Sequence, residues 1–229
     1  SYHYNSMVGW HYYLDYPWAI NQLDIKPGST LLDAGCGFGT LQFLLLEFCF
    51  NVIGVDLNIP TVSQSMMKKY KIKKFISENS NSEKMKSYYK YLKRGVGNWY
   101  YKSSRNVPRI KMSKNNSIPV GSLEWYELNL LDLRALEEKS IDSIISISVL
   151  EHNDHKRFNK IVRELLRVLK PGGKLIVTVQ ATDQKDWFDD NSKGWSYTLD
   201  SLLNLFDLSR DTENNFNEYS SIFRRIKES

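Results

Sequence analysis

The chain has 229 residues, of which 41% are hydrophobic and 25% are charged, and its formal net charge is +5. These ordinary globular values exclude global disorder, and two cysteines, Cys36 and Cys49, are too few for a disulfide framework. No charged start with an apolar stretch opens the sequence, and the longest apolar run, residues 43–50, is too short to cross a bilayer. We therefore expect one cytoplasmic domain over residues 1–229, with reduced thiols and no membrane span.

The hydrophobic pattern predicts helices alternating with strands in the first third of the chain. Residues 1–28 are expected to form an aromatic N-terminal cap, with helical spacing at 12–23. The next expected elements, in chain order, are a strand at 30–34, a helix at 38–48, a strand at 51–56 and a helix that starts at Pro60 and runs into Lys74.

A basic, tyrosine-rich insertion follows at residues 75–120, with a partial helical signal at 83–93. Regular patterning then returns, and it predicts a strand at 124–128, a strand at 143–148, an amphipathic helix at 154–169, a strand at 174–179 and a short helix at 198–206. Strands that alternate with helices indicate an α/β fold with a mostly parallel sheet covered on both faces.

A glycine-rich run joins the first strand to its helix. Asp33 is followed by Gly35, Gly37 and Gly39, a G-x-G-x-G spacing rather than the G-x-G-x-x-G of dinucleotide sites. Glycines let a ligand approach the backbone, and N–H groups at a helix start attract a carboxylate. Because Asp33 can bind an ammonium group, the run suits a zwitterionic amino acid, which is one end of S-adenosyl-L-methionine.

Asp56 ends the second strand, where a carboxylate can accept hydrogen bonds from both hydroxyls of a ribose. Alone it could equally be a helix cap or a turn residue. Its position after the glycine-rich run favours the ribose role.

With these motifs in order, the sequence resembles the class I S-adenosylmethionine-dependent methyltransferases. The matching segments are LLDAGCGFGTLQFLL (31–45), VIGVDL (52–57), LNLLDL (128–133), IDSIISISVLEH (141–152) and LLRVLKPGGKLIVTV (165–179). The resemblance implies a Rossmann-like three-layer sandwich with a seven-stranded sheet and a reversed final hairpin. Only weak strand candidates follow Phe206, where that hairpin is expected.

The resemblance also implies roles for individual residues. The methionine end of the cofactor would lie among Asp33, Gly35, Cys36, Gly37 and Gly39. The ribose would bind Asp56, with the adenine beside Leu57, Asn129 and Leu130, and with Ser146 close to the cofactor. Asn129 departs from the family's usual Asp, and Asp132 is a nearby alternative.

His152 is the candidate catalytic base, because an O–H or N–H acceptor must lose a proton and His does this near neutral pH. A packing or capping role for His152 is the alternative. His155 could share a helix face with it and hold a metal, but no third ligand has a convincing spacing, so no metal is expected.

Residues 68–117 carry fifteen Lys or Arg and two Asp or Glu, a net of +13, whereas the rest of the chain has a net charge of −8. The stretch suits an anionic small molecule or glycan, such as a phosphorylated or nucleotide-linked sugar. RNA, acidic lipid and a merely solvated face are the alternatives.

The segments GWHYYLD (9–15) and LQFLL (41–45) also resemble methyltransferases of surface-glycan clusters. The function expected is therefore methyl transfer to an O or N atom of a small molecule or glycan. The alternatives are an RNA methyltransferase and a cofactor-binding module without catalysis.

Overall fold

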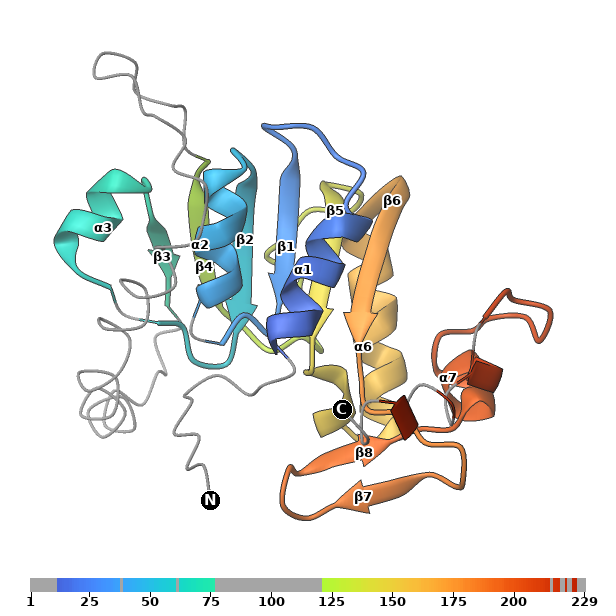
Figure 1. The fold of residues 1–229 in the computed structure, drawn as a ribbon. Helices are drawn as coiled ribbons and strands as arrows, with labels where there is room; N and C mark the ends of the chain where they lie inside the picture. Colours follow the sequence, from blue (N-terminus) through green and yellow to red (C-terminus); the bar gives the residue numbers. More distant parts are fainter. Residues whose placement is uncertain are drawn as a thin grey trace.

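The computed structural model describes residues 12–37, 39–60, 62–76 and 121–214, with short pieces at 216–218, 221 and 224–225. At its centre, the described strands form a six-stranded sheet in the order β3-β4-β2-β1-β5-β6, and all neighbouring pairs are parallel (Figure 1). The strands are β1 (Thr30–Ala34), β2 (Asn51–Asp56), β3 (Lys73–Phe75), β4 (Leu123–Glu127), β5 (Ile141–Ile147) and β6 (Leu169–Thr178).

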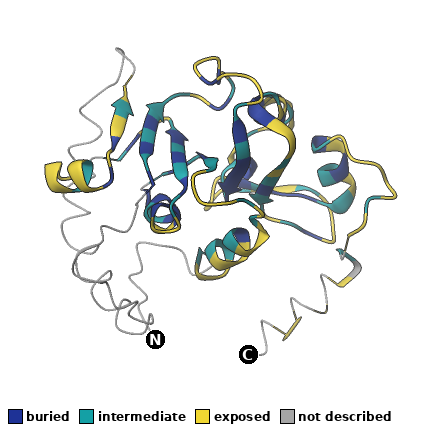
Figure 2. Ribbon diagram, turned by 90° about the horizontal axis from the view of Figure 1, so that it is seen from above, coloured by how far each residue is buried: buried dark blue, intermediate teal, exposed yellow. Residues whose placement is uncertain are grey.

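Helices cover both faces of this sheet, so the α/β three-layer prediction is confirmed. On one face lie α1 (Tyr12–Gln22) and α2 (Thr40–Glu47), and on the other lies α6 (His155–Val168) (Figure 1). Each face has its own apolar cluster, one built on α2 with Leu41 and Leu45 and the other on α6 with Phe158 and Leu165. Figure 2 shows buried strands between helices whose outer faces are exposed. Shorter helices are α3 (Gln64–Lys69), η1 (Leu150–His152), α7 (Leu199–Leu205) and η2 (Phe216–Glu218).

The sheet reverses its strand order at β1, because β2 flanks it on one side and β5 on the other. In open parallel sheets this reversal leaves a crevice at the carboxyl ends of the strands, and ligands bind there. The glycine-rich loop between β1 and α2 and the η1 turn after β5 both leave the sheet at this edge. The fold therefore brings together segments that are more than 100 residues apart in the sequence.

The expected helix from Pro60 to Lys74 is wrong in its second half. The helix α3 ends at Lys69, Lys71 adopts a left-handed backbone with φ of 50°, and β3 then pairs with β4. Edge pairing with a strand about fifty residues away outweighs the local helical pattern. The helix predicted at 83–93 and most of the basic insertion lie outside the described residues.

The second difference concerns the antiparallel hairpin. It consists of β7 (Trp187–Asp189) and β8 (Gly194–Ser196), and it precedes α7 instead of following Phe206. It forms a sheet of its own below the carboxyl ends of β5 and β6 in Figure 1. Among the described residues the main sheet therefore has six strands, not the seven that the resemblance implied.

Asp186 fastens this hairpin to the helices. Its carboxylate accepts hydrogen bonds from the Thr198 backbone N–H at 2.8 Å and from the Ser201 hydroxyl, and His155 Nε2 on α6 lies 3.1 Å from it. Burial raises the pKa of Asp186, but these hydrogen bonds outweigh that effect and lower the pKa to about 2. The carboxylate stays ionised at neutral pH and joins the hairpin to both α6 and α7.

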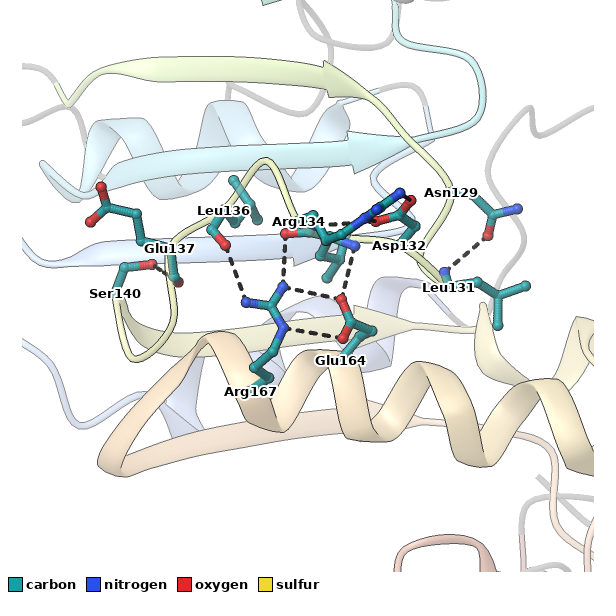
Figure 3. Close-up of polar contacts among 10 residues, drawn as sticks. Asn129, Leu131, Asp132, Arg134, Leu136, Glu137, Ser140, Glu164 and Arg167 are labelled. Carbon is teal, nitrogen blue, oxygen red and sulfur yellow. Dashed lines mark hydrogen bonds and ion pairs between the residues drawn. The ribbon is translucent and has the colours of Figure 1, made fainter.

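Arg167 ties the connection between β4 and β5 to α6 (Figure 3). Its guanidinium donates to the carbonyl oxygens of Leu133 at 2.9 Å and Leu136 at 3.3 Å. It also pairs with Glu164 at 3.1 Å, whose carboxylate accepts the Leu133 N–H at 3.0 Å. These bonds pair backbone groups in a connection that belongs to no helix or strand, where the Leu133 carbonyl oxygen also accepts the Leu136 N–H at 2.8 Å.

We expect Arg167→Leu to lower the free energy of unfolding by about 2–3 kcal/mol, because it removes charge-assisted hydrogen bonds and leaves partly buried acceptors unpaired. Urea unfolding followed by circular dichroism measures the loss. Arg134→Leu is the matched control, since Arg134 is 86% exposed and pairs only with Asp132 among the described residues. The control should unfold almost as the wild-type chain does, because exposed ion pairs contribute little, and equal losses in the two variants would contradict this account.

Candidate functional site

The glycine-rich loop is held against β2 by its own backbone. The N–H groups of Gly35 and Cys36 donate to the Val55 carbonyl oxygen at 2.8 and 3.0 Å. Gly35 has φ of 81°, a left-handed conformation that favours glycine. A Cβ built on Gly35 would lie 2.3 Å from Cγ2 of Val149, so the loop and the end of β5 approach more closely than any side chain permits.

Gly37 presents the opposite situation. A Cβ built there meets no described atom within 4 Å, so none of the described residues covers the loop at this point. The Gly37 N–H donates to Asp56 Oδ2 at 2.9 Å, and the other oxygen of Asp56 accepts the Asn58 N–H at 3.1 Å. The structure therefore places Asp56 beside the glycine-rich loop, as its sequence position suggested. Leu57, which follows it, is 61% exposed.

Asp33 is almost completely buried at the end of β1. One carboxylate oxygen accepts a hydrogen bond from Gln42 Nε2 at 3.0 Å, and Gln42 Oε1 accepts one from the Trp125 indole at 2.5 Å. Burial raises the pKa of Asp33 to about 7, the Gln42 bond lowers it and the charge of Asp56 raises it. No cation of the described residues is among these influences, so the carboxyl group is suited to a positively charged ligand.

Gln42 and Trp125 were not singled out in the sequence, although they fix the orientation of Asp33. Both side chains are fully buried. A Cβ on Gly54 would lie 2.5 Å from Trp125, so β2 also needs a glycine where this pair packs. In the sequence, the signal for this arrangement was a polar residue, Gln42, among the apolar residues of α2. That signal does not indicate which side chains Gln42 contacts.

The remaining predicted cofactor residues lie around the same edge. The Ser146 hydroxyl is buried on β5 and donates to the Ala34 carbonyl oxygen at 3.0 Å, so it joins β5 to the start of the loop. Cys36 is buried, and burial raises the pKa of its thiol. Asn129 and Leu130 follow β4, next to the end of β2, because the Leu128 N–H donates to the Asp56 carbonyl oxygen at 3.0 Å.

Asn129 accepts the Leu131 N–H through its side-chain oxygen at 3.0 Å (Figure 3), which leaves its amide group for another partner. Leu130 is buried. Asp132, the alternative, is half exposed and binds Arg134 through both oxygens. The structure therefore favours Asn129 over Asp132 as a residue that can face a ligand.

His152 ends η1 and its ring is exposed. Its Nδ1 lies 2.9 Å from the Lys193 carbonyl oxygen, which can only accept, so Nδ1 carries the proton and the lone pair of the neutral ring is on Nε2. His155 begins α6 and contacts Asp186, Trp195 and Tyr197 instead. The two histidines therefore lie on different elements with different partners.

Glu151, next to His152, is a residue that the sequence reasoning missed. It is 4% exposed, and its Oε2 has no hydrogen-bond partner among the described groups. Burial raises the pKa of Glu151 to about 7, a hydrogen bond from its own backbone and the charge of His152 lower it, and the charge of Asp15 raises it. The charges of Glu151 and Asp33 both add to the effect of burial in raising the pKa of Tyr12, so the two carboxyl groups lie near one tyrosine of α1.

These features define a class I, Rossmann-like methyltransferase fold with a site that fits S-adenosyl-L-methionine. A buried carboxylate without a cation can take the ammonium group, and the open backbone at Gly37 admits a ligand. Asp56 at the end of β2 can hold the ribose. Within the described residues, no helix has both the length and the apolar character needed to cross a bilayer.

Comparison with known proteins places the chain in a family. The model of the methyltransferase domain matches residues 13–214. The chain therefore belongs to the S-adenosylmethionine-dependent methyltransferases, whose cofactor is S-adenosyl-L-methionine.

Individual relatives match in part only. Phosphoethanolamine N-methyltransferase 3 of Arabidopsis thaliana is 42% identical over 45 residues, which are 19% of this chain and 9% of that protein. Cyclopropane mycolic acid synthase MmaA2 of Mycobacterium tuberculosis is 24% identical over 160 residues, 69% of this chain and 39% of that protein. The chain thus matches less than two thirds of the length of these relatives.

Solved structures match over most of this chain, at low identity and with TM-scores below 0.5. The [4+2]-cyclase SpnF has a TM-score of 0.49 at 17% identity, over 84% of this chain and 54% of that one. A 1,6-didemethyltoxoflavin-N1-methyltransferase of Burkholderia thailandensis, solved with S-adenosylhomocysteine, has a TM-score of 0.47 at 16% identity, over 79% of this chain and 59% of that one. Family membership rests on the family model and not on these scores.

Proposed function

We propose that this chain transfers a methyl group from S-adenosyl-L-methionine to an O or N atom of a small molecule or glycan. The observation that carries the proposal is the buried Asp33 carboxylate beside the open glycine-rich loop at the carboxyl edge of the sheet. The cofactor supplies an electrophilic methyl carbon, so the protein has to bind, orient and, for many acceptors, remove a proton.

The cofactor roles proposed for this chain follow the positions of its side chains. Asp33 binds the ammonium group, and the backbone at Gly35, Gly37 and Gly39 surrounds the methionine end. Asp56 binds the ribose hydroxyls. A carboxylate has about four acceptor sites, so Asp56 can keep its hydrogen bond from the Gly37 N–H or exchange it for a hydroxyl. Leu57, Asn129 and Leu130 border the adenine.

We further propose that the basic insertion at 75–120 binds an anionic substrate. A phosphorylated or nucleotide-linked sugar is one such substrate. The net charge of +13 over residues 68–117 supports an anion. RNA is the alternative, and it predicts salt-sensitive binding to total tRNA, with a steep fall in affinity between 50 and 200 mM salt.

Calorimetry with S-adenosylmethionine and S-adenosylhomocysteine tests the cofactor assignment directly. Both should bind one site per chain. A labelled-methyl screen of nucleotide sugars, glycan extracts, amines and RNA then identifies the acceptor. Absence of binding to either nucleotide would remove the basis of the proposed function, whereas binding without turnover on every pool would favour a non-catalytic module.

His152 is the base that we propose for the acceptor proton. We expect His152→Gln to lower kcat about 10²- to 10⁴-fold, the usual contribution of a positioned base, with the KM of the acceptor and the Kd of the cofactor nearly unchanged. Initial rates with labelled cofactor provide the measurement. His155→Gln is the matched control, because that ring contacts the hairpin and not the end of η1. A His152 variant with the wild-type kcat would exclude the assignment.

A further inference from the structure

Glu151 combines burial with an unused hydrogen-bonding atom. The side chain is 4% exposed, and Oε2 has no partner in the described part of the molecule. Natural structures pair most buried polar atoms, because an unpaired one carries its full desolvation cost. Packing alone gives no reason for a carboxylate here. An aliphatic side chain would fill the same space without this cost.

The position of Glu151 places it next to the cofactor loop. It lies in η1, directly after the carboxyl end of β5. Two residues earlier, Val149 occupies the space that a side chain at Gly35 would need. On its other side, a Cβ on Gly194 at the start of β8 would be 3.2 Å from Cγ of Glu151. The Glu151 side chain thus lies against the hairpin, two residues beyond the contact between Val149 and the glycine-rich loop.

The groups around Glu151 are acidic and aromatic. On α1, the charge of Asp15 raises the pKa of Glu151. Burial raises the pKa of the Tyr12 phenol, and the charge of Glu151 raises it further. After β8, burial raises the pKa of the Tyr197 phenol, and the charge of Glu151 again raises it further. On its own element, His152 is the described group whose charge favours ionised Glu151.

The adjoining loop supplies no further cation for Glu151, because the Lys193 ammonium group pairs with Asp190 at 3.2 Å. Carboxylates together with tyrosine rings favour a cation.

Building on the proposed function, we propose that Glu151 binds a protonated amine of the methyl acceptor, next to the methionine end of the cofactor. This narrows the acceptor atom from O or N to nitrogen. Glu151 receives a hydrogen bond from the acceptor's ammonium group and fixes the nitrogen in place. A separate proton must leave the nitrogen before it can attack, and Nε2 of His152 takes it.

The reaction balances with these two groups. The ammonium nitrogen gives one proton to His152, and its lone pair forms the new C–N bond as the bond from the methyl carbon to sulfur breaks. The electron pair of that bond stays on sulfur, and the proton on His152 passes to solvent. Glu151 keeps its charge throughout, so it is a binding residue and not the base.

A first experiment measures the carboxyl group without turnover. In protein labelled with ¹³C at the glutamate carboxyl carbons and saturated with S-adenosylhomocysteine, Glu151→Gln identifies the Glu151 signal by its absence. Methylammonium chloride should shift that signal, and potassium chloride at the same concentration should not. The variant serves only to assign the signal, and the two salts are compared on the wild-type chain. An identical response of the signal to both salts would overturn the proposal.

A second experiment separates the acceptor from the sulfonium, which is also a cation. Calorimetry of Glu151→Gln should give Kd values for S-adenosylmethionine and S-adenosylhomocysteine within about twofold of wild type. If affinity for the sulfonium form alone falls, Glu151 faces the cofactor and the proposal is wrong. If the wild-type chain binds neither nucleotide, the proposed function fails first, which is a distinguishable outcome.

Kinetics on the amine found in the labelled-methyl screen complete the test. We expect Glu151→Gln to raise the KM of the amine at least about tenfold, the effect of losing one charge-assisted hydrogen bond. His152→Gln should act on kcat instead. Glu138→Gln, at an exposed glutamate in the connection between β4 and β5, is the control and should change neither. A hydroxyl acceptor whose KM is unaffected in Glu151→Gln would overturn the assignment.

Discussion

Asp33→Asn should lose S-adenosylmethionine binding and yet unfold at a higher temperature than the wild-type chain at pH 8. Removal of one partner from a buried ion pair costs about 3–5 kcal/mol, which corresponds to a loss of affinity of a hundredfold or more. The stability gain has the opposite cause, because this carboxylate is buried and no cation of the described residues offsets its desolvation. Calorimetry and thermal unfolding of the same samples measure both effects.

The sign of the pH dependence follows from the pKa of Asp33, which is about 7 in the folded chain against 3.8 for the ordinary group. Between these values the folded chain holds a proton that the unfolded chain has released, so stability falls as pH rises through this window. The accumulated cost is roughly 4 kcal/mol at pH above 7. Asp33→Asn should therefore match wild type near pH 4 and exceed it at pH 8.

Cofactor binding has the reverse dependence on pH. The ammonium group favours ionised Asp33, so affinity should rise as pH increases towards and past 7, and binding at pH 6 should release a proton. Calorimetry in buffers of different ionisation enthalpy counts that proton. Asp132→Asn, at an exposed carboxylate, serves as the control. Wild-type affinity in Asp33→Asn at pH 8 would refute the ammonium role.

The second large effect concerns the close approach of the loop to β5. In Gly35→Ala the new Cβ would lie 2.3 Å from Val149 Cγ2 on a backbone with φ of 81°. Since Val149 is held at the end of β5, the loop must move, and we expect about 3 kcal/mol or more of lost stability. Cofactor affinity should fall with it. Urea unfolding and calorimetry provide the measurements.

Gly28→Ala isolates the backbone contribution. Gly28 has φ of 89°, but a Cβ there meets nothing within 4 Å, so only the left-handed penalty applies. That penalty is about 1–2 kcal/mol. Adding Val149→Ala to Gly35→Ala removes the two Cγ atoms and should restore part of the lost stability. The rescue is only partial, because the Cβ atom of residue 149 would still lie 2.9 Å from the new Cβ at residue 35. If Gly35→Ala and Gly28→Ala were equally stable, the steric account would be wrong.

The sequence was most informative where local pattern and tertiary structure agree. The strands β1 and β2 begin and end at the predicted residues, because short apolar runs between turn residues have few alternatives in a buried parallel sheet. The helix α6 begins one residue after Asp154, whose side chain accepts the Arg157 N–H at 2.9 Å. An amphipathic stripe with an N-cap predicts such a helix without any distant contact.

Features that depend on distant partners were not predictable. The strand β3 exists through its pairing with β4, and the local sequence around Lys73 favoured a helix. The orientation of Asp33 depends on Gln42, which is itself held by Trp125, 83 residues after Gln42 in the sequence.

Glu151 and His152, for which we propose roles towards the acceptor, are neighbours in the sequence, but one side chain is buried and the other is exposed. The sequence pointed to the histidine alone. The assigned roles at the glycine-rich loop stay predictions until a ligand is measured.

The hairpin β7–β8 has a consequence for how relatives of this chain can diverge. It shares no strand pairing with the main sheet and is anchored by Asp186, while its strand β7 carries two exposed aromatic side chains, Trp187 and Phe188, 46% and 41% exposed. Neither residue belongs to the β1–α2 junction. Descendants of one ancestral enzyme could therefore acquire new acceptors by altering the hairpin while they inherit the nucleotide site unchanged.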